Sequence, residues 1–124
     1  MTLVLVMVGG AVGAPLRYVI DLAVQRWHGG RFPWGTFTVN VLGSLVLGAV
    51  LGLAASGSVP AETMALVGTG LCGALTTYST FTFETVRLVE EGAWAAAASN
   101  VLLSLTGAVA AGALGWLVVQ AVVP

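Results

Sequence analysis

The stretch Gly70-Leu71-Cys72-Gly73-Ala74-Leu75-Thr76-Thr77-Tyr78-Ser79-Thr80-Phe81 places a run of hydroxyl-bearing side chains inside a long apolar segment. This run follows closely spaced glycines, and it predicts that a helix over residues 61–91 is broken near 73–78. Unpaired backbone groups are costly in hydrocarbon, so a break persists there only if it is buried in protein or faces water or ions. The pattern therefore predicts a binding site, and the alternative is a packing kink whose hydroxyls bond back to nearby carbonyls.

The rest of the chain is as apolar as the flanks of this stretch. Of 124 residues, 58% are hydrophobic and 7% are charged, whereas soluble domains carry roughly a quarter charged residues. A membrane-spanning helix needs about 20 mostly apolar residues. The composition predicts an all-α membrane protein with one domain over 1–124 and four transmembrane helices, at approximately 3–25, 36–55, 61–91 and 93–123.

Charge and cysteine content exclude several functions. A net charge of −1 with four scattered arginines offers no basic face for nucleic acid. The single Cys72 and the single His28 cannot form an intramolecular disulfide or a His-rich metal site. The first basic residue is Arg17, so the apolar N-terminus predicts a retained helix and not a cleaved signal peptide. We expect transport across the membrane and not enzymatic catalysis.

Small residues recur at a spacing that lets helix backbones approach closely. We expect them to favour an oligomer, with packing inside one subunit as the alternative. The three sets are Gly9 with Gly13, then Ser44, Gly48 and Gly52, then Gly107, Ala111 and Gly115. The few basic residues give only a modest preference for placing the first and third loops in the cytoplasm, so a chain that inserts both ways can form an antiparallel pair.

Polar and aromatic residues near the break are candidates for an ion pathway. Tyr78 and Phe81 share one face of a half-helix expected to start near Thr77, and aromatic ring edges carry partial positive charge. With the hydroxyls of Ser79 and Thr80 they can replace part of the hydration of an anion. The alternative for the two rings is ordinary aromatic packing.

Other polar residues lie within the expected spans. Asn40 needs a partner, which is either a neighbouring helix or, through its NH₂ group, the pathway. Asn100 and Ser104 are four residues apart, and we expect a plain interhelical hydrogen bond there.

Charged residues near the ends of the expected spans have simpler interpretations. For Arg17 we expect a local ion pair with Asp21, one turn away. Glu84 and Arg87 either surround a wet vestibule or lie near the membrane interface.

Four segments together resemble the small fluoride channels of the CrcB (Fluc) family. Gly9-Gly10-Ala11-Val12-Gly13-Ala14-Pro15-Leu16-Arg17-Tyr18 is similar to the first-helix signature of that family, and Pro33-Trp34-Gly35-Thr36-Phe37-Thr38-Val39-Asn40-Val41-Leu42-Gly43-Ser44 to the second. The stretch at 70–81 is the most specific, and Leu102-Leu103-Ser104 follows in the same order. The resemblance covers nearly the whole chain.

This resemblance implies a passive channel that exports fluoride across a prokaryotic inner membrane. It implies an antiparallel, dual-topology homodimer with two pathways and a structural sodium ion held by the backbone carbonyls of Gly73 and Thr76. The implied vestibule residues are Arg17 and Glu84. The implied fluoride-pathway residues are Asn40, Tyr78, Ser79, Thr80, Phe81 and Ser104.

The sequence departs from the family pattern at three positions and leaves two rival functions. Tyr78 and Leu45 stand where phenylalanine is usual, and Asn100 where tyrosine is expected. A small proton-coupled multidrug transporter needs a mid-membrane glutamate on its first helix, where this chain offers only Asp21 near the end. A non-transporting assembly subunit accounts for the small residues but not for the polar break.

Overall fold

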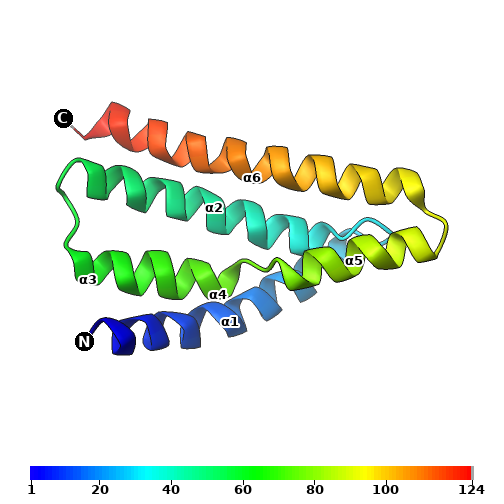
Figure 1. The fold of residues 1–124 in the computed structure, drawn as a ribbon, viewed down its shortest axis with the longest axis horizontal. Helices are drawn as coiled ribbons and strands as arrows, with labels where there is room; N and C mark the ends of the chain where they lie inside the picture. Colours follow the sequence, from blue (N-terminus) through cyan, green and yellow to red (C-terminus); the bar gives the residue numbers. More distant parts are fainter. Residues whose placement is uncertain (124) are drawn as a thin grey trace.

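The computed structural model describes residues 1–123 as long helices that lie side by side and alternate in direction (Figure 1). After α1 and α2, the chain runs back along the molecule through a segment that is interrupted near its middle, and it ends with α6. The N-terminus and the end of α6 lie at the same end of the molecule. In chain order the elements are α1 (Thr2–Trp27), α2 (Trp34–Ala55), α3 (Ala61–Thr63), the π-helix η1 (Met64–Cys72), α4 (Gly73–Leu75), α5 (Ser79–Glu90) and α6 (Trp94–Val122).

Within the described residues, three helices, α1, α2 and α6, are long and apolar enough to cross a membrane. Their outer surfaces carry large apolar side chains, such as Leu3, Val109 and Val122, which are 72%, 72% and 75% exposed. Helices that expose such side chains along their length are stable only where lipid covers them. The chain is thus an integral, multi-pass membrane protein.

Glycines let two pairs of helices pack with their backbones in contact. On α1, a Cβ at Gly9 or Gly13 would collide with backbone atoms of Leu66 and Leu71 in η1. On the other pair, a Cβ at Gly48 of α2 would collide with the backbone of Gly112 in α6. The stripes of small residues therefore pack helices within one chain, which is the alternative considered for them, and the oligomer expected from them stays a prediction.

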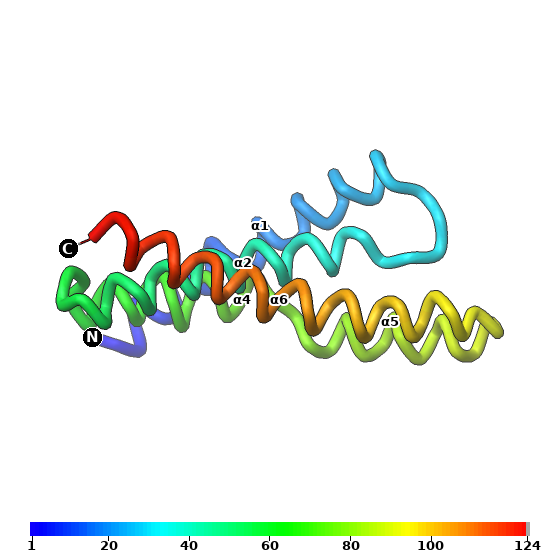
Figure 2. The backbone as a smooth tube through the Cα atoms, turned by 90° about the horizontal axis from the view of Figure 1, so that it is seen from above, coloured from blue at the N-terminus to red at the C-terminus, as the bar shows by residue number. Residues whose placement is uncertain are grey.

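The helices separate toward the end of the molecule opposite the termini. Figure 2 shows that α1 and the start of α2 diverge there from α5 and α6. An aromatic cluster lies in this region, where the rings of Phe32 and Trp34 are 4.5 Å apart and Trp34 meets Phe37 edge to face at 5.8 Å. The turn from α5 to α6 uses Gly92 at φ 76°, a conformation that side chains disfavour.

The segment from Ala61 to Glu90 is not one helix. Its first part begins after Pro60 and continues as a π-helix, where the apolar sequence predicts an ordinary α-helix. It ends at Leu75, where Thr76 takes an extended conformation (φ −81°, ψ 158°), and helix resumes at Ser79. The helix break lies at residues 76–78, inside the region where the sequence placed it.

Candidate functional site

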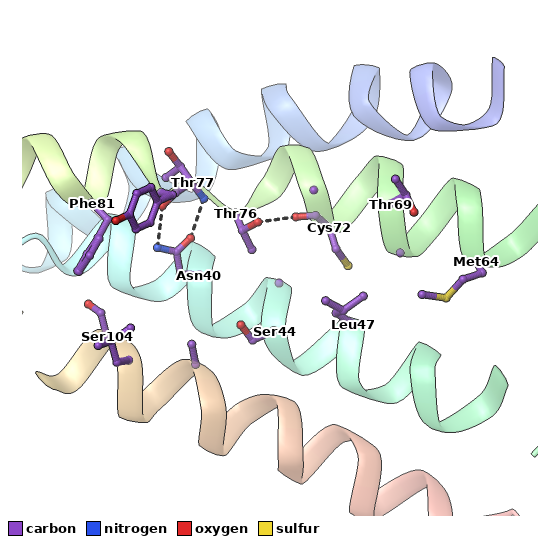
Figure 3. A pocket seen from close by; sticks show the side chains of 16 residues that line it. Asn40, Ser44, Leu47, Met64, Thr69, Cys72, Thr76, Thr77, Phe81 and Ser104 are labelled. Atoms are coloured by element: carbon purple, nitrogen blue, oxygen red, sulfur yellow. Dashed lines mark hydrogen bonds between the residues drawn. The ribbon is translucent and has the colours of Figure 1, made fainter. Parts of the chain in front are cut away.

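The side chain of Asn40, in α2, completes the hydrogen bonding of the helix break. Its Nδ2 donates to the carbonyl oxygen of Thr77 at 3.1 Å, and its Oδ1 accepts from the Thr77 N–H at 2.7 Å (Figure 3). One carboxamide thus serves both backbone polar groups of Thr77, a residue that lies outside the helices on either side. Of the two partners considered for Asn40, the structure shows a neighbouring segment, and the remaining N–H of its NH₂ group is not used in this pairing.

The hydroxyl of Thr77 organises the start of α5. Thr77 Oγ1 accepts from the backbone N–H of Thr80 at 3.2 Å and donates to Thr80 Oγ1 at 3.0 Å. Ser79 Oγ lies 3.4 Å from the same oxygen. The first N–H groups of a helix have no acceptor inside the helix, and the Thr77 hydroxyl supplies an acceptor for one of these groups. Helix α5 begins at Ser79, two residues later than expected.

The bonds of Asn40 and of the Thr77 hydroxyl deprive the carbonyl groups of Gly73 and Thr76 of the N–H donors that they would have in a continuous helix. In a continuous α-helix the Thr77 N–H bonds to the carbonyl of Gly73, and the Thr80 N–H bonds to the carbonyl of Thr76. Here the first is donated to Asn40 and the second to the Thr77 hydroxyl. The carbonyl oxygens of Gly73 and Thr76 are therefore released for another partner, and both residues line a cavity.

That cavity has a volume of about 500 Å³ and lies between α2, the broken segment and α6 (Figure 3). Asn40, Tyr78, Phe81 and Ser104, all expected along a pathway, contribute to its lining. Ser79 and Thr80, which were also expected there, do not, because their hydroxyls face Thr77. Among residues 1–123, no charged side chain lines this cavity.

Two aromatic residues at the start of α5 form a pair at the cavity wall: Tyr78 immediately precedes the helix and Phe81 lies in its first turn. The ring centroids of Tyr78 and Phe81 are 6.1 Å apart with an interplanar angle of 41°. Tyr78 is 80% exposed, although it lies beside the break in the middle of the segment. Within residues 1–123, a ring so exposed is covered by little of the protein on its outer side.

A buried polar chain joins α5 to α6 behind the cavity. Asn100 is fully buried, its Nδ2 donates to Thr85 Oγ1 at 2.8 Å, and Ser104 Oγ donates to Asn100 Oδ1 at 3.2 Å. The interhelical hydrogen bond expected for the Asn100 and Ser104 pair is confirmed. Its partner Thr85 was not among the predicted residues.

The charged residues do not gather as a single group. Glu84 accepts a hydrogen bond from the buried Thr36 and lines a second cavity of about 410 Å³, together with Arg31 and Arg87. Arg17 lies elsewhere, and its Nε donates to the carbonyl oxygen of Ala74 at 3.3 Å, next to the break.

The expected ion pair between Arg17 and Asp21 was wrong. Asp21 accepts from Gln25 instead, and in the part of the chain that the structure describes the one ion pair joins Arg87 and Glu91 at 3.6 Å. The carbonyl near the break competes successfully for the guanidinium because a helix end leaves such oxygens unpaired.

Sequence reasoning missed Thr77 as the centre of the site. The sequence shows it as one hydroxyl among several. In the structure the backbone N–H and C=O of Thr77 form hydrogen bonds with Asn40, and its hydroxyl forms hydrogen bonds with the start of α5. A usable signal was present, because a mid-span carboxamide and a broken helix each need partners that the other can supply.

Comparison with known proteins identifies the family. The model of the family described as CrcB-like protein, Camphor Resistance (CrcB), matches residues 4–116. The chain belongs to the CrcB family. The matched residues include the whole of the break, Asn40 with its two hydrogen bonds to Thr77, and Ser104.

Several curated relatives of this CrcB chain are similar over most of their length. A protein of Frankia casuarinae named fluoride-specific ion channel FluC 1 is 55% identical, over 98% of each chain. One of the same name in Streptomyces avermitilis is 52% identical over 93% of each chain. A fluoride-specific ion channel FluC of Shewanella oneidensis is 47% identical over 84% of each chain.

Proposed function

We propose that this protein is a passive, fluoride-selective channel. The observation that carries the proposal is the helix break at residues 76–78, whose backbone bonds to Asn40 and which opens on an uncharged, mostly apolar cavity with a few polar groups in its wall. Family membership and the names of its relatives agree with it. The interrupted segment from Ala61 to Glu90 is then the fourth membrane crossing, with its break at mid-membrane.

A second copy of the chain is the proposed cover for the cavity. Gly73 and Tyr78 are exposed, so in a single subunit the break would face lipid directly. Irregular backbone is tolerated at membrane depth only when protein or water covers it. The charge bias between the two sides is small, so the copies can insert in opposite directions and form an antiparallel homodimer with two pathways.

A structural sodium ion fits the released carbonyls of Gly73 and Thr76. Hard cations such as sodium prefer oxygen ligands, and these two oxygens have lost their regular α-helical donors to Asn40 and to the Thr77 hydroxyl. Two copies of the chain supply four such oxygens. Bound there, the ion supplies positive charge that holds the two breaks together.

The fluoride pathway is proposed to follow the cavity wall. Ring edges of Tyr78 and Phe81 and the unused N–H of Asn40 offer weakly positive groups without a formal charge, and Ser104 lies at the same wall. Such groups replace part of the hydration of an anion and still release it. The hydroxyls of Ser79 and Thr80 contact the Thr77 hydroxyl and so help to hold the break in place. They reach the fluoride pathway only if they turn away from Thr77.

The second cavity is proposed as a wet vestibule with Glu84 at its wall. Arg17, on the other side of the broken segment, supports the end of α4 and adds positive potential near the break. In a prokaryotic inner membrane, an inside-negative potential favours the exit of fluoride by roughly 2.3 kcal/mol per 100 mV. A passive pore therefore suffices for export.

The test is an efflux assay with purified protein in liposomes loaded with potassium fluoride. Addition of valinomycin sets a potential, and a fluoride electrode then records release. We expect rapid efflux that does not depend on a proton gradient, because no acidic side chain among residues 1–123 lines the cavity to carry protons. Release that requires a proton gradient, or uptake of a cationic drug driven by one, contradicts the proposal and favours the multidrug transporter.

A further inference from the structure

A buried hydrogen-bond chain runs from the cavity wall on α6 to the backbone of α5. Its members are Ser104, Asn100, Thr85 and the carbonyl oxygen of Phe81. Asn100 is 0% exposed and Ser104 is 7% exposed, so water does not reach the middle of this chain. Ser104 also belongs to the wall of the 500 Å³ cavity (Figure 3).

The direction of every hydrogen in this chain follows from its last member. A carbonyl oxygen only accepts, so Thr85 Oγ1 donates its single hydrogen to Phe81, at 2.8 Å. Asn100 must therefore present its NH₂ group to Thr85, and its Oδ1 then faces Ser104. That oxygen can only accept, so the hydroxyl hydrogen of Ser104 is directed into the protein.

The direction of this hydrogen decides which partial charge the Ser104 hydroxyl presents to the cavity. With its hydrogen bonded to Asn100, Ser104 presents oxygen lone pairs to the cavity and not a donor. An anion gains the Ser104 hydrogen only by taking it from Asn100. We propose that Asn100 is a positioning residue that holds the Ser104 hydroxyl away from the anion and so weakens fluoride binding at this point of the pathway. This inference rests on the proposed function.

The test compares the half-saturating fluoride concentration for efflux in wild type, Asn100→Leu and Ser104→Ala. Leucine has nearly the shape of asparagine without its polar atoms, so in Asn100→Leu the Ser104 hydrogen turns to the cavity. A net hydrogen bond is worth about two- to tenfold in an equilibrium constant, and we expect the half-saturating concentration to fall by about that factor. Adding Asn100→Leu to Ser104→Ala should produce no further change.

Two further variants separate positioning from packing. Thr85→Val removes the anchor that fixes the direction of the Asn100 amide, so it should lower the half-saturating concentration as well, and it keeps the inference testable if Asn100→Leu does not fold. Ser99→Ala, at a neighbouring α6 position outside the polar chain, is the matched control and should leave the value unchanged.

The outcomes are distinct for the two proposals. An unchanged or raised half-saturating concentration in Asn100→Leu and Thr85→Val overturns the positioning role, as does a shift that persists when Ser104 is replaced. In those cases wild-type efflux still supports the fluoride channel. If wild type itself conducts no fluoride, the proposed function fails and the inference fails with it.

Discussion

The carboxamide of Asn40 and the peptide groups of Thr77 are joined by two hydrogen bonds, of 3.1 and 2.7 Å, across 37 positions of sequence. This relationship connects α2 to the break and releases the carbonyl of Gly73 from its regular donor. A single side chain thus stabilises the break and adds a polar group to the wall of the cavity.

Replacing Asn40 by aspartate should break one of its two hydrogen bonds to Thr77 and block the pathway. The carboxylate cannot donate to the Thr77 carbonyl, and its charge repels an anion in the adjacent cavity. An energetic penalty of about 1.4 kcal/mol on the passing anion lowers the rate tenfold, so we expect fluoride efflux to fall by at least about tenfold. Ser44→Ala, at the wall of the same cavity and one turn along α2, is the control and should retain most of the flux. Efflux at the wild-type rate in Asn40→Asp removes Asn40 from the pathway.

Phe81→Ile tests the aromatic ring edge. The substitution keeps an apolar side chain at the cavity wall but removes the aromatic ring, whose edge carries partial positive charge. We expect efflux to fall by about fivefold, while size-exclusion chromatography in detergent shows an intact dimer. Phe83→Ile is the matched control, because Phe83 lies on the same helix, is 64% exposed and does not line the cavity. Equal rates for the two variants count against a role for the ring edge.

Gly48→Ala should destabilise the contact between α2 and α6. A methyl group at Gly48 collides with the backbone of Gly112, which cannot move without separating the helices. Overpacking of this kind costs about 1–3 kcal/mol, which should lower the thermal unfolding midpoint in detergent. At Gly112 the added methyl meets only Ser44 O, at 3.6 Å, so Gly112→Ala should melt close to wild type. Indistinguishable midpoints for both variants contradict the packing described here.

Sodium should stabilise the folded protein if the carbonyls of Gly73 and Thr76 hold it. Ligand binding to the folded state raises its stability by about 2.7 kcal/mol at a hundred times the dissociation constant. Thermal unfolding in detergent, with sodium replaced by a bulky organic cation at constant ionic strength, should show a midpoint that rises with sodium concentration. A midpoint that depends on ionic strength alone, whichever cation is used, argues against the site.

The position of the break was predictable because its cause is local. Hydroxyl-bearing residues at 76–80 compete with the helix for backbone hydrogen bonds, and this is visible in the sequence without knowledge of the fold. The π-helix at Met64–Cys72 was not predictable in the same way. Its composition is that of an ordinary apolar helix, and its backbone packs against Gly9 and Gly13 of α1, a contact between segments far apart in the sequence.

Partners distant in sequence were the harder part of the site. Reasoning from helical spacing paired Arg17 with Asp21, but the carbonyl of Ala74, 57 positions away, takes the guanidinium. The same limitation left Asn40 with two possible partners and gave no partner to Thr85. Spacing also could not decide which surface the small residues face, and the structure places Gly48 and Gly9 against helices of the same chain.

The most direct test of the central claim, that the broken segment serves a fluoride pathway, is simultaneous measurement of two anions. Liposomes that contain the purified protein are loaded with equal fluoride and chloride, and valinomycin sets the same driving force for both. The account predicts that a fluoride electrode records rapid release while a chloride electrode records only the leak of protein-free vesicles. Release of both anions at similar rates, or of neither above the leak, contradicts it.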